Sequence, residues 1–244
     1  MSETSMLIGY SGRTIGREEL ALVPTPPATE THRPIPHHDI IGALIETLGF
    51  RHIGVVHDEY AVSPDGMKMF GVLDLATEME GCRFSIGLRN SHDKSMRLAM
   101  TCGYRVLVCS NMAFSGDFTP VLAKHSKSFS LIDCISVGVD RMQRNFEPMR
   151  KQVETWQRSE LTDVTAKVVI YEAFVEAKLE APKHLARTVH DLYFEPKYEE
   201  FRPRTIWSLS NAFTSAFKEL DPIPQFKVTA KLGEFLEDRF SQSF

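Results

Sequence analysis

The chain has 244 residues, of which 43% are hydrophobic and 25% charged, and its formal net charge at pH 7 is -4. A chain of this length and composition can bury an apolar core without disulfides or metals, which excludes a largely disordered protein. Its longest apolar runs, residues 40–48 and 106–109, are well below the roughly 20 residues of a membrane span. The N-terminus lacks the pattern of a signal peptide, so we expect a cytoplasmic protein with no membrane partner.

The charges are unevenly distributed along the chain. Residues 1–80 carry 5 Lys and Arg against 12 Asp and Glu, residues 81–158 carry 12 against 6, and residues 159–244 carry 11 against 14. Clustered charge of one sign attracts partners of the opposite sign. The basic middle of the chain therefore predicts a surface that faces a polyanion, unless folding disperses these side chains.

The first expected element is an extended segment, residues 1–36, because prolines recur in its second half at Pro24, Pro26, Pro27, Pro34 and Pro36. Proline lacks an amide donor and disfavours helix in the residue before it. An amphipathic helix is predicted next, over residues 40–49, from the spacing of Ile40, Leu44 and Leu48 and from Gly49 at its end.

An antiparallel sheet follows in the prediction. Residues 52–62 and 67–75 are typical of two strands, and Ser63-Pro64-Asp65-Gly66 between them is typical of a tight turn, which together indicate a β-hairpin. Two further strands are predicted over residues 82–89 and 104–111 by alternation of side chains. We expect residues 37–130 to form this basic α+β sheet region.

From Leu131 the period changes to that of helices. Apolar residues step by three or four from Leu131 to Trp156, which predicts one long helix that Pro148 kinks or splits. Helices are also expected near residues 162–179, 183–192, 205–220 and 226–240. The predicted fold is α+β: an N-terminal helix and antiparallel sheet with a hairpin, then a mostly helical region, residues 131–244, packed on the sheet as one domain.

Residues 89–95, Arg-Asn-Ser-His-Asp-Lys-Ser, concentrate polar groups between two predicted strands. Cations, hydroxyls and backbone amides in one loop can bind a phosphate, and a plain polar turn is the alternative. Aromatic residues interleave with cations nearby, as in binders of single-stranded nucleic acid, although aromatics on a half-buried strand also face the core. The candidate nucleic-acid-binding residues are Arg83, Arg89, Asn90, Ser91, His92, Lys94, Arg97, Tyr104, Arg105 and Phe114.

No motif identifies an enzyme. The chain contains no P-loop, dinucleotide-binding or HExxH string, and its cysteines and histidines have no recognised zinc spacing. We therefore predict no catalytic residues, no cofactor and no metal site, and consider a non-enzymatic role the better interpretation. A magnesium-dependent nuclease built on Asp58, Glu59 or Asp74 stays open as an alternative.

Two long strings resemble a known family: GLRNSHDKSMRLAMTCGYRVLVCSNMAFSG, residues 87–116, and RTIWSLSNAFTSAFKEL, residues 204–220, together with the N-terminal TPPATETHRPIPHHDII. They are similar to the phage/plasmid-like proteins of domain-of-unknown-function family 932. The resemblance implies a phage- or plasmid-encoded protein of a bacterial host cell, with a role in recombination, replication or evasion of host defence. The order of elements is also loosely similar to the core of single-strand annealing recombinases.

These observations lead to two hypotheses. The first is a protein that binds single-stranded DNA through the basic sheet, has a role in recombination or strand annealing, and forms a homo-oligomer through its helical half. The alternative is an anti-defence protein that binds a host factor by protein–protein contacts, using the acidic residues 1–80 as a nucleic-acid mimic.

Overall fold

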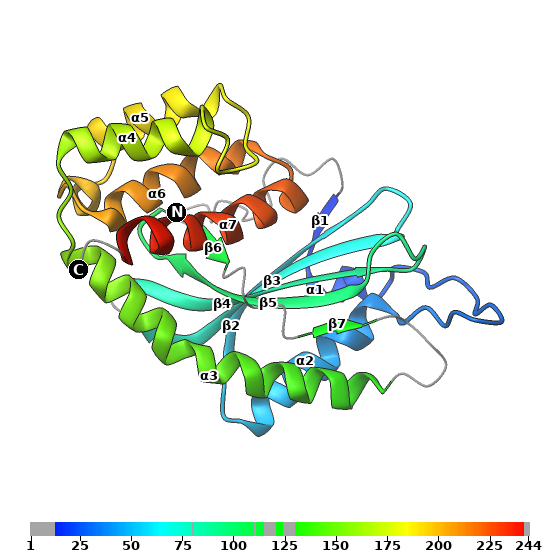
Figure 1. Ribbon diagram of the computed structural model, residues 1–244. Coiled ribbons are helices and arrows are strands. Elements are labelled where there is room, and N and C mark those ends of the chain that lie inside the picture. Colours follow the sequence, from blue (N-terminus) through cyan, green and yellow to red (C-terminus); the bar gives the residue numbers. More distant parts are fainter. Residues whose placement is uncertain (1–12, 80, 110, 115–120, 124–129, 242–244) are drawn as a thin grey trace. The chain divides into compact units, whose positions relative to one another are not determined.

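The computed structural model describes residues 13–79, 81–109, 111–114, 121–123 and 130–241 (Figure 1). It contains an antiparallel sheet and, after it, mostly helices, so the predicted α+β class is confirmed. The described residues form two compact units. The first draws on Met1–Arg105 and Phe118–Phe146, and the second on Val106–Asp117 and Glu147–Phe244.

The first unit is built on the sheet. Its elements are β1 (Arg13–Ile15), α1 (Arg17–Leu20), α2 (His37–Phe50), β2 (Val55–Val62), β3 (Lys68–Met79), β4 (Cys82–Ser91), β5 (Leu98–Val106), β7 (Val121–Ala123) and the first part of α3 (Leu131–Arg158). The strands lie in the order β1-β2-β3-β4-β5, and β7 pairs with β5. The pairs β1–β2, β2–β3, β3–β4 and β5–β7 are antiparallel.

The predicted hairpin is confirmed as β2 and β3, and residues 24–36 have no helix or strand, as the prolines indicate. The extended segment begins later than predicted, however, because β1 and α1 occupy residues 13–20. The strand predicted over 104–111 is wrong in its bounds: β5 runs from Leu98 to Val106, and residues 107–109 form a turn. Every residue of β5 except Arg105 is buried, and a strand covered on both faces carries no alternation to mark its start.

One face of the sheet is apolar and carries the core of the first unit. Side chains alternate between the two faces of a strand, so Tyr60, Leu73 and Ile86 share this face, and all three are fully buried. Helix α2 buries Ile40, Ile41, Leu44 and Leu48 as predicted, and it lies with α3 on the same side of the strands (Figure 1). The ring of Phe84 on β4 stacks on Phe146 of α3, with centroids 4.3 Å apart.

The second unit is helical apart from β6. It comprises β6 (Met112–Phe114), the second part of α3, α4 (Asp163–Phe174), α5 (Leu185–Phe194), α6 (Ile206–Ala216) and α7 (Pro222–Ser241), with short 3-10 turns at Glu199–Phe201 and Phe217–Glu219. Helix α3 continues through Pro148 and is not split. Helix α6 is the centre of this unit, because nearly all of its residues are buried and Phe213 stacks on Phe174 at 5.7 Å.

The close approach of β2 and β3 gives a stability prediction. A Cβ added at Gly71 would lie 2.8 Å from the ring of Tyr60, which is fully buried and cannot move aside. We expect Gly71→Ala to lower the free energy of unfolding by about 1–3 kcal/mol, as overpacking does. Urea unfolding followed by circular dichroism measures it.

Gly42 provides the matched control, since it lies on the exposed side of α2 and a Cβ added there would meet no atom within 4 Å. Gly42→Ala should raise the free energy of unfolding by about 0.5–1 kcal/mol, because alanine favours helix. A Gly71→Ala variant as stable as the parent would contradict the packing described.

Candidate nucleic-acid interface

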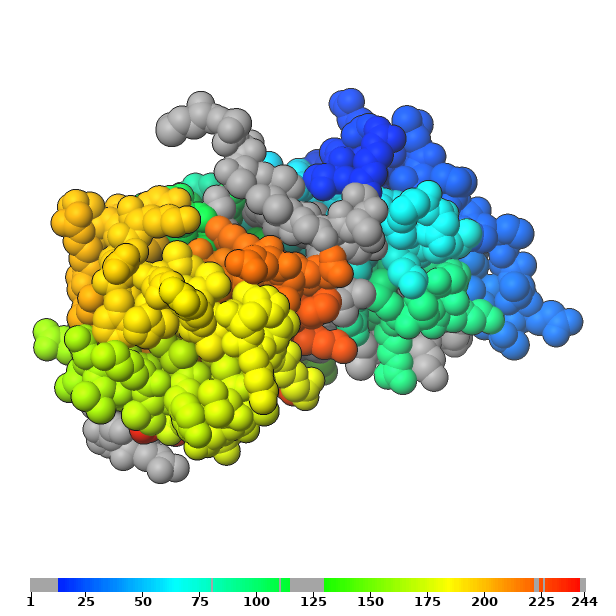
Figure 2. Space-filling view, turned by 90° about the horizontal axis from the view of Figure 1, so that it is seen from above, coloured from blue at the N-terminus to red at the C-terminus, as the bar shows by residue number. Residues whose placement is uncertain are grey.

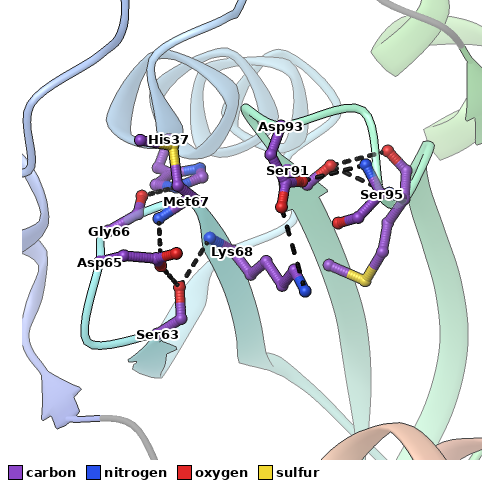
Figure 3. Close-up of polar contacts among 10 residues, drawn as sticks. His37, Ser63, Asp65, Gly66, Met67, Lys68, Ser91, Asp93 and Ser95 are labelled. Atoms are coloured by element: carbon purple, nitrogen blue, oxygen red, sulfur yellow. Dashed lines mark hydrogen bonds and ion pairs between the residues drawn. The ribbon is translucent and has the colours of Figure 1, made fainter.

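Two turns and a proline-rich segment meet at one end of the sheet (Figure 3). The β3–β4 register pairs Lys68 with Ser91, and the amide of His92 donates to the carbonyl of Met67 at 2.8 Å. This register places the β2–β3 turn, residues 63–68, beside the β4–β5 loop, residues 92–97. We call these two turns, together with residues 32–37, the sheet-end cluster.

The β2–β3 turn is held by its own side chains. The Ser63 hydroxyl donates to Asp65 Oδ1 at 2.5 Å, and the Met67 amide donates to the same oxygen at 3.0 Å. These two hydrogen bonds lower the pKa of Asp65. Gly66 has a φ of 71°, a conformation that glycine adopts without strain, which explains why this tetrapeptide forms the turn.

The β4–β5 loop is equally well defined. The Ser91 hydroxyl donates to the Met96 carbonyl at 2.9 Å and accepts from the Met96 amide at 3.0 Å, and the Ser95 amide donates to Asp93 Oδ1 at 3.0 Å. Burial alone would raise the pKa of Asp93, but hydrogen bonds from Ser95 and Ser91 and the charge of Lys68 hold it below its ordinary value. Lys94 lies between these anchors with a φ of 63°.

Three histidines fasten residues 32–37 to the two turns. The ring of His32 donates from Nε2 to the His92 carbonyl at 3.0 Å, and His92 Nε2 donates to the Ile35 carbonyl at 3.0 Å. His37 Nε2 donates to the Gly66 carbonyl at 3.1 Å and its Nδ1 accepts from Asn90 Nδ2 at 2.9 Å. Because a carbonyl only accepts and the amide nitrogen of Asn90 only donates, His37 carries a proton on Nε2 and none on Nδ1, so this bonding requires the neutral ring.

The rings of His37 and His92 stack at 3.9 Å with an interplanar angle of 8°. Both side chains are almost completely buried, and His92 Nδ1 has no hydrogen-bond partner in the described chain. Burial lowers the pKa of His92, because a low-dielectric site disfavours the charged ring. The cluster therefore depends on neutral histidines at its centre.

The second face of the sheet is polar although it is also buried. Asp74 on β3 is fully buried, accepts from the Ser85 hydroxyl at 2.6 Å, and forms an ion pair with Arg105 Nη1 at 2.5 Å. Buried charges are stable only when paired and hydrogen-bonded. Asp74 and Arg105 thus act as internal structural partners rather than as solvent-facing groups.

Arg89 lies on the same polar face, since it pairs with Phe70 in a register that also pairs Ser85 with Asp74. Its Nε is buried without a hydrogen-bond partner in the described residues, and burial lowers its pKa. The lowered pKa reflects desolvation, which disfavours the charged form of the guanidinium.

The structure brings only some of the predicted binding residues together. Asn90, Ser91, His92 and Lys94 belong to or adjoin the sheet-end cluster, and Arg97 ends its loop; among these, Lys94 and Arg97 are exposed. Arg83 is ion-paired with Glu78 and Arg105 with Asp74. Tyr104 and Phe114 are 6% and 8% exposed, so they lie in the core and present no open face for stacking on a base.

Other exposed cations were not among the predicted binding residues. Arg33 is exposed, and its neighbours His32 and Ile35 are both hydrogen-bonded to His92, which fixes this part of the sheet-end cluster. On α3, Arg141 and Arg144 are exposed opposite the buried Val139 and Met142. The helical period that predicts the apolar stripe of α3 also marks these positions as outward-facing.

The carboxylates considered for magnesium are engaged elsewhere. Asp58 accepts from Arg17 at 2.7 Å and from the Tyr60 hydroxyl at 2.6 Å, and Asp74 is paired as described. In the described part of the chain, no group of three or more His, Cys, Asp or Glu side chains is arranged to hold a metal ion. Within the same residues, no helix is both long and apolar enough to cross a membrane.

A family model described as "Domain of unknown function (DUF932)" matches residues 30–229. The chain belongs to the DUF932 family. The match includes most of both units and the whole sheet-end cluster, which confirms the resemblance noted from the sequence. No curated protein and no solved structure matches this DUF932 chain.

The buried histidines predict a pH dependence of stability. The pKa of His92 is lowered in the folded DUF932 chain, so the unfolded chain, with a His pKa of about 6.5, binds protons first as the pH falls. The free energy of unfolding should therefore decrease below about pH 6.5. Melting temperatures measured across this range test it.

His92→Gln is the informative variant, because its amide can still donate to the Ile35 carbonyl but does not titrate. The decrease on acidification should be smaller in His92→Gln than in the parent. His184→Gln, at an exposed histidine that precedes α5 and makes no side-chain capping hydrogen bond, is the matched control and should show the same decrease as the parent. Equal slopes in parent and His92→Gln would refute the role given to this ring.

The Asp74–Arg105 pair predicts a large and localised loss of stability. Asp74→Asn leaves the mostly buried Arg105 without its carboxylate, which should lower the free energy of unfolding by about 3 kcal/mol. Glu78→Gln, which removes the partner of Arg83 at a side chain that is 52% exposed, should cost less than about 1 kcal/mol. Urea unfolding of the two variants measures the difference, and similar losses would be inconsistent with the buried pair.

Proposed function

We propose that this DUF932 chain binds single-stranded nucleic acid by contacting phosphates with the cations of the sheet-end cluster. The observation that carries the proposal is the exposure of Lys94 and Arg97 on a loop whose backbone is fixed by Ser91, Asp93 and Met96. A cation on a loop with an ordered backbone loses less conformational freedom on binding phosphate than one on a disordered segment.

Two further cations support the same surface. Arg33 lies on the segment anchored to His92, and Lys68 lies 4.0 Å from Asp93. The acids of the two turns, Asp65 and Asp93, are both engaged by hydrogen bonds from their own turns. With four Lys or Arg residues against these two acids, the cluster has a net positive charge, which favours phosphate.

The proposal differs from the sequence-based hypothesis in its contacts. With Tyr104 and Phe114 in the core, it contains no stacking contribution from these two rings. Phosphate contacts carry no sequence information and weaken with salt. We therefore propose binding with little sequence preference and a steep salt dependence.

The acidic-mimic alternative receives less support from the geometry. Several of the N-terminal acids that motivated it form ion pairs within the chain: Glu19 pairs with Arg13, Asp58 with Arg17 and Asp74 with Arg105. A nucleic-acid mimic needs an array of unpaired carboxylates, because its partner's cations must find free negative charge.

The test is fluorescence anisotropy with a labelled single-stranded oligonucleotide, titrated at salt concentrations between about 50 mM and 200 mM. Each phosphate contact contributes about -0.7 to the slope of log K against log salt. Lys94→Ala/Arg97→Ala should weaken binding and reduce the magnitude of the slope by about 1.4.

Lys178→Ala/Lys183→Ala is the matched control, because it removes two exposed lysines of the second unit and the same total charge. It should leave the slope unchanged. The proposal fails if the parent does not bind, or if the Lys94/Arg97 variant binds with the parental slope.

A further inference from the structure

Helix α4 exposes an apolar seam to solvent. Val164 is 71% exposed, Val168 39%, Tyr171 55% and the C-cap residue Val175 51%, and they follow one another at steps of four, three and four residues. At 3.6 residues per turn this spacing puts all four on one narrow stripe. The space-filling view shows the yellow-green part of the chain that contains α4 at the surface (Figure 2).

The stripe is not needed for packing within the second unit. The opposite side of α4 already supplies the core, where Ala166, Val169, Ala173 and Phe174 are buried. The helix is therefore apolar on two sides, one buried and one exposed. Contiguous exposed apolar patches mark interaction sites in soluble proteins, whereas single exposed apolar residues do not.

The spacing of the four exposed apolar residues indicates what kind of partner packs against them. Steps of four, three and four are those of d, a, d and a positions in a heptad, the repeat by which two helices pack knobs into holes. Val168 and Val175 then occupy a positions, where β-branched residues favour two strands. A second helix with the same repeat is the complementary surface, and a second copy of this chain provides it.

The flanking charges favour one orientation. Lys167 lies at the g position and Glu172, five residues later, at the e position. In a parallel pair a g side chain meets the e side chain five residues on in its partner, so lysine faces glutamate at both edges. In an antiparallel pair lysine would face lysine at one edge and glutamate would face glutamate at the other, and like charges repel.

Lys167 and Glu172 also have contacts within their own chain, and these contacts still allow the two residues to pair across a dimer. Glu172 accepts from Arg239 through Oε2 at 3.0 Å, so its second oxygen is still able to accept. The Lys167 ammonium lies 5.2 Å from the ring centroid of Phe194, and a flexible lysine can turn outward from an aromatic face.

We propose that α4 pairs in parallel with α4 of a second copy, through Val164, Val168, Tyr171 and Val175, to form a two-fold dimer. The contact is isologous, so each residue of the seam meets its own counterpart. A seam of two heptads is small compared with a standard interface of about 800 Å² per partner, so we expect a weak dimer that exchanges with the monomer.

Sedimentation equilibrium of the full chain at micromolar concentrations tests the seam. The parent should fit a monomer–dimer equilibrium, and Val168→Glu should raise the dimer dissociation constant by at least about tenfold, because it buries an unpaired charge. Leu22→Glu, at a leucine that is 82% exposed in the first unit, is the matched control and should dimerise like the parent. Unchanged melting temperatures show that both variants fold.

Disulfide cross-linking tests the orientation. In the parallel pair Val168 meets Val168 of the second copy, so Val168→Cys should form a covalent dimer under mild oxidation. Glu176→Cys, outside the seam, and the parent with its own four cysteines should not. A monomeric parent, a Val168→Glu variant that dimerises as the parent does, or a Val168→Cys variant that does not cross-link would each overturn the proposal.

Discussion

The pairing of β3 with β4 is the constraint on which the rest of the first unit depends. Its register runs from Lys68 opposite Ser91 to Met79 opposite Cys82, with one irregularity after Asp74. A shift by one residue would exchange the two faces of a strand. It would move Asp74 away from Ser85 and Arg105 and would separate the turn at residues 63–68 from the loop at residues 92–97. The buried polar pair and the sheet-end cluster are therefore consequences of one alignment.

This dependence explains why polar side chains are tolerated in the middle of a buried sheet. Asp74, Ser85 and Arg105 satisfy one another, whereas replacement of any single member leaves a charge or acceptor unpaired in a low-dielectric site. An incorrect register would leave several of these groups unpaired at once, and each of them would lower the free energy of unfolding. The buried polar face therefore favours the native register, as the apolar face does, because incorrect registers leave its charges and hydrogen-bonding groups unpaired.

Local patterns in the sequence were sufficient for α2, the β2–β3 hairpin and the stripe of α3, because each is amphipathic or carries turn residues. They were insufficient for β5, which is buried on both faces and shows no alternation. The seam of α4 was not predicted for the same reason, because apolar residues on two sides of a helix weaken the helical periodicity of its sequence. The loop at residues 89–95 was identified by composition, but His92 was not recognised as structural, since its ring bonds to the backbone carbonyl of Ile35 and its own carbonyl accepts from His32, which no side-chain pattern reveals. Tyr104 illustrates the remaining ambiguity, since interleaving with arginine is compatible with either a stacking surface or a core.

The two proposed surfaces lie in different units and respond to different physical variables, which makes them separable. Phosphate binding by Lys94 and Arg97 releases counterions and weakens as salt rises, whereas an apolar seam weakens little with salt because its main contribution is the removal of apolar surface from water.

A dimer carries two sheet-end clusters, so a strand long enough to reach both gains affinity from the second contact without any new interaction type. Val168→Glu should then reduce affinity for long strands more than for short ones, while Lys94→Ala/Arg97→Ala reduces affinity for both. Anisotropy with short and long oligonucleotides distinguishes these outcomes, and equal losses for both lengths in Val168→Glu would mean that dimerisation does not contribute to binding.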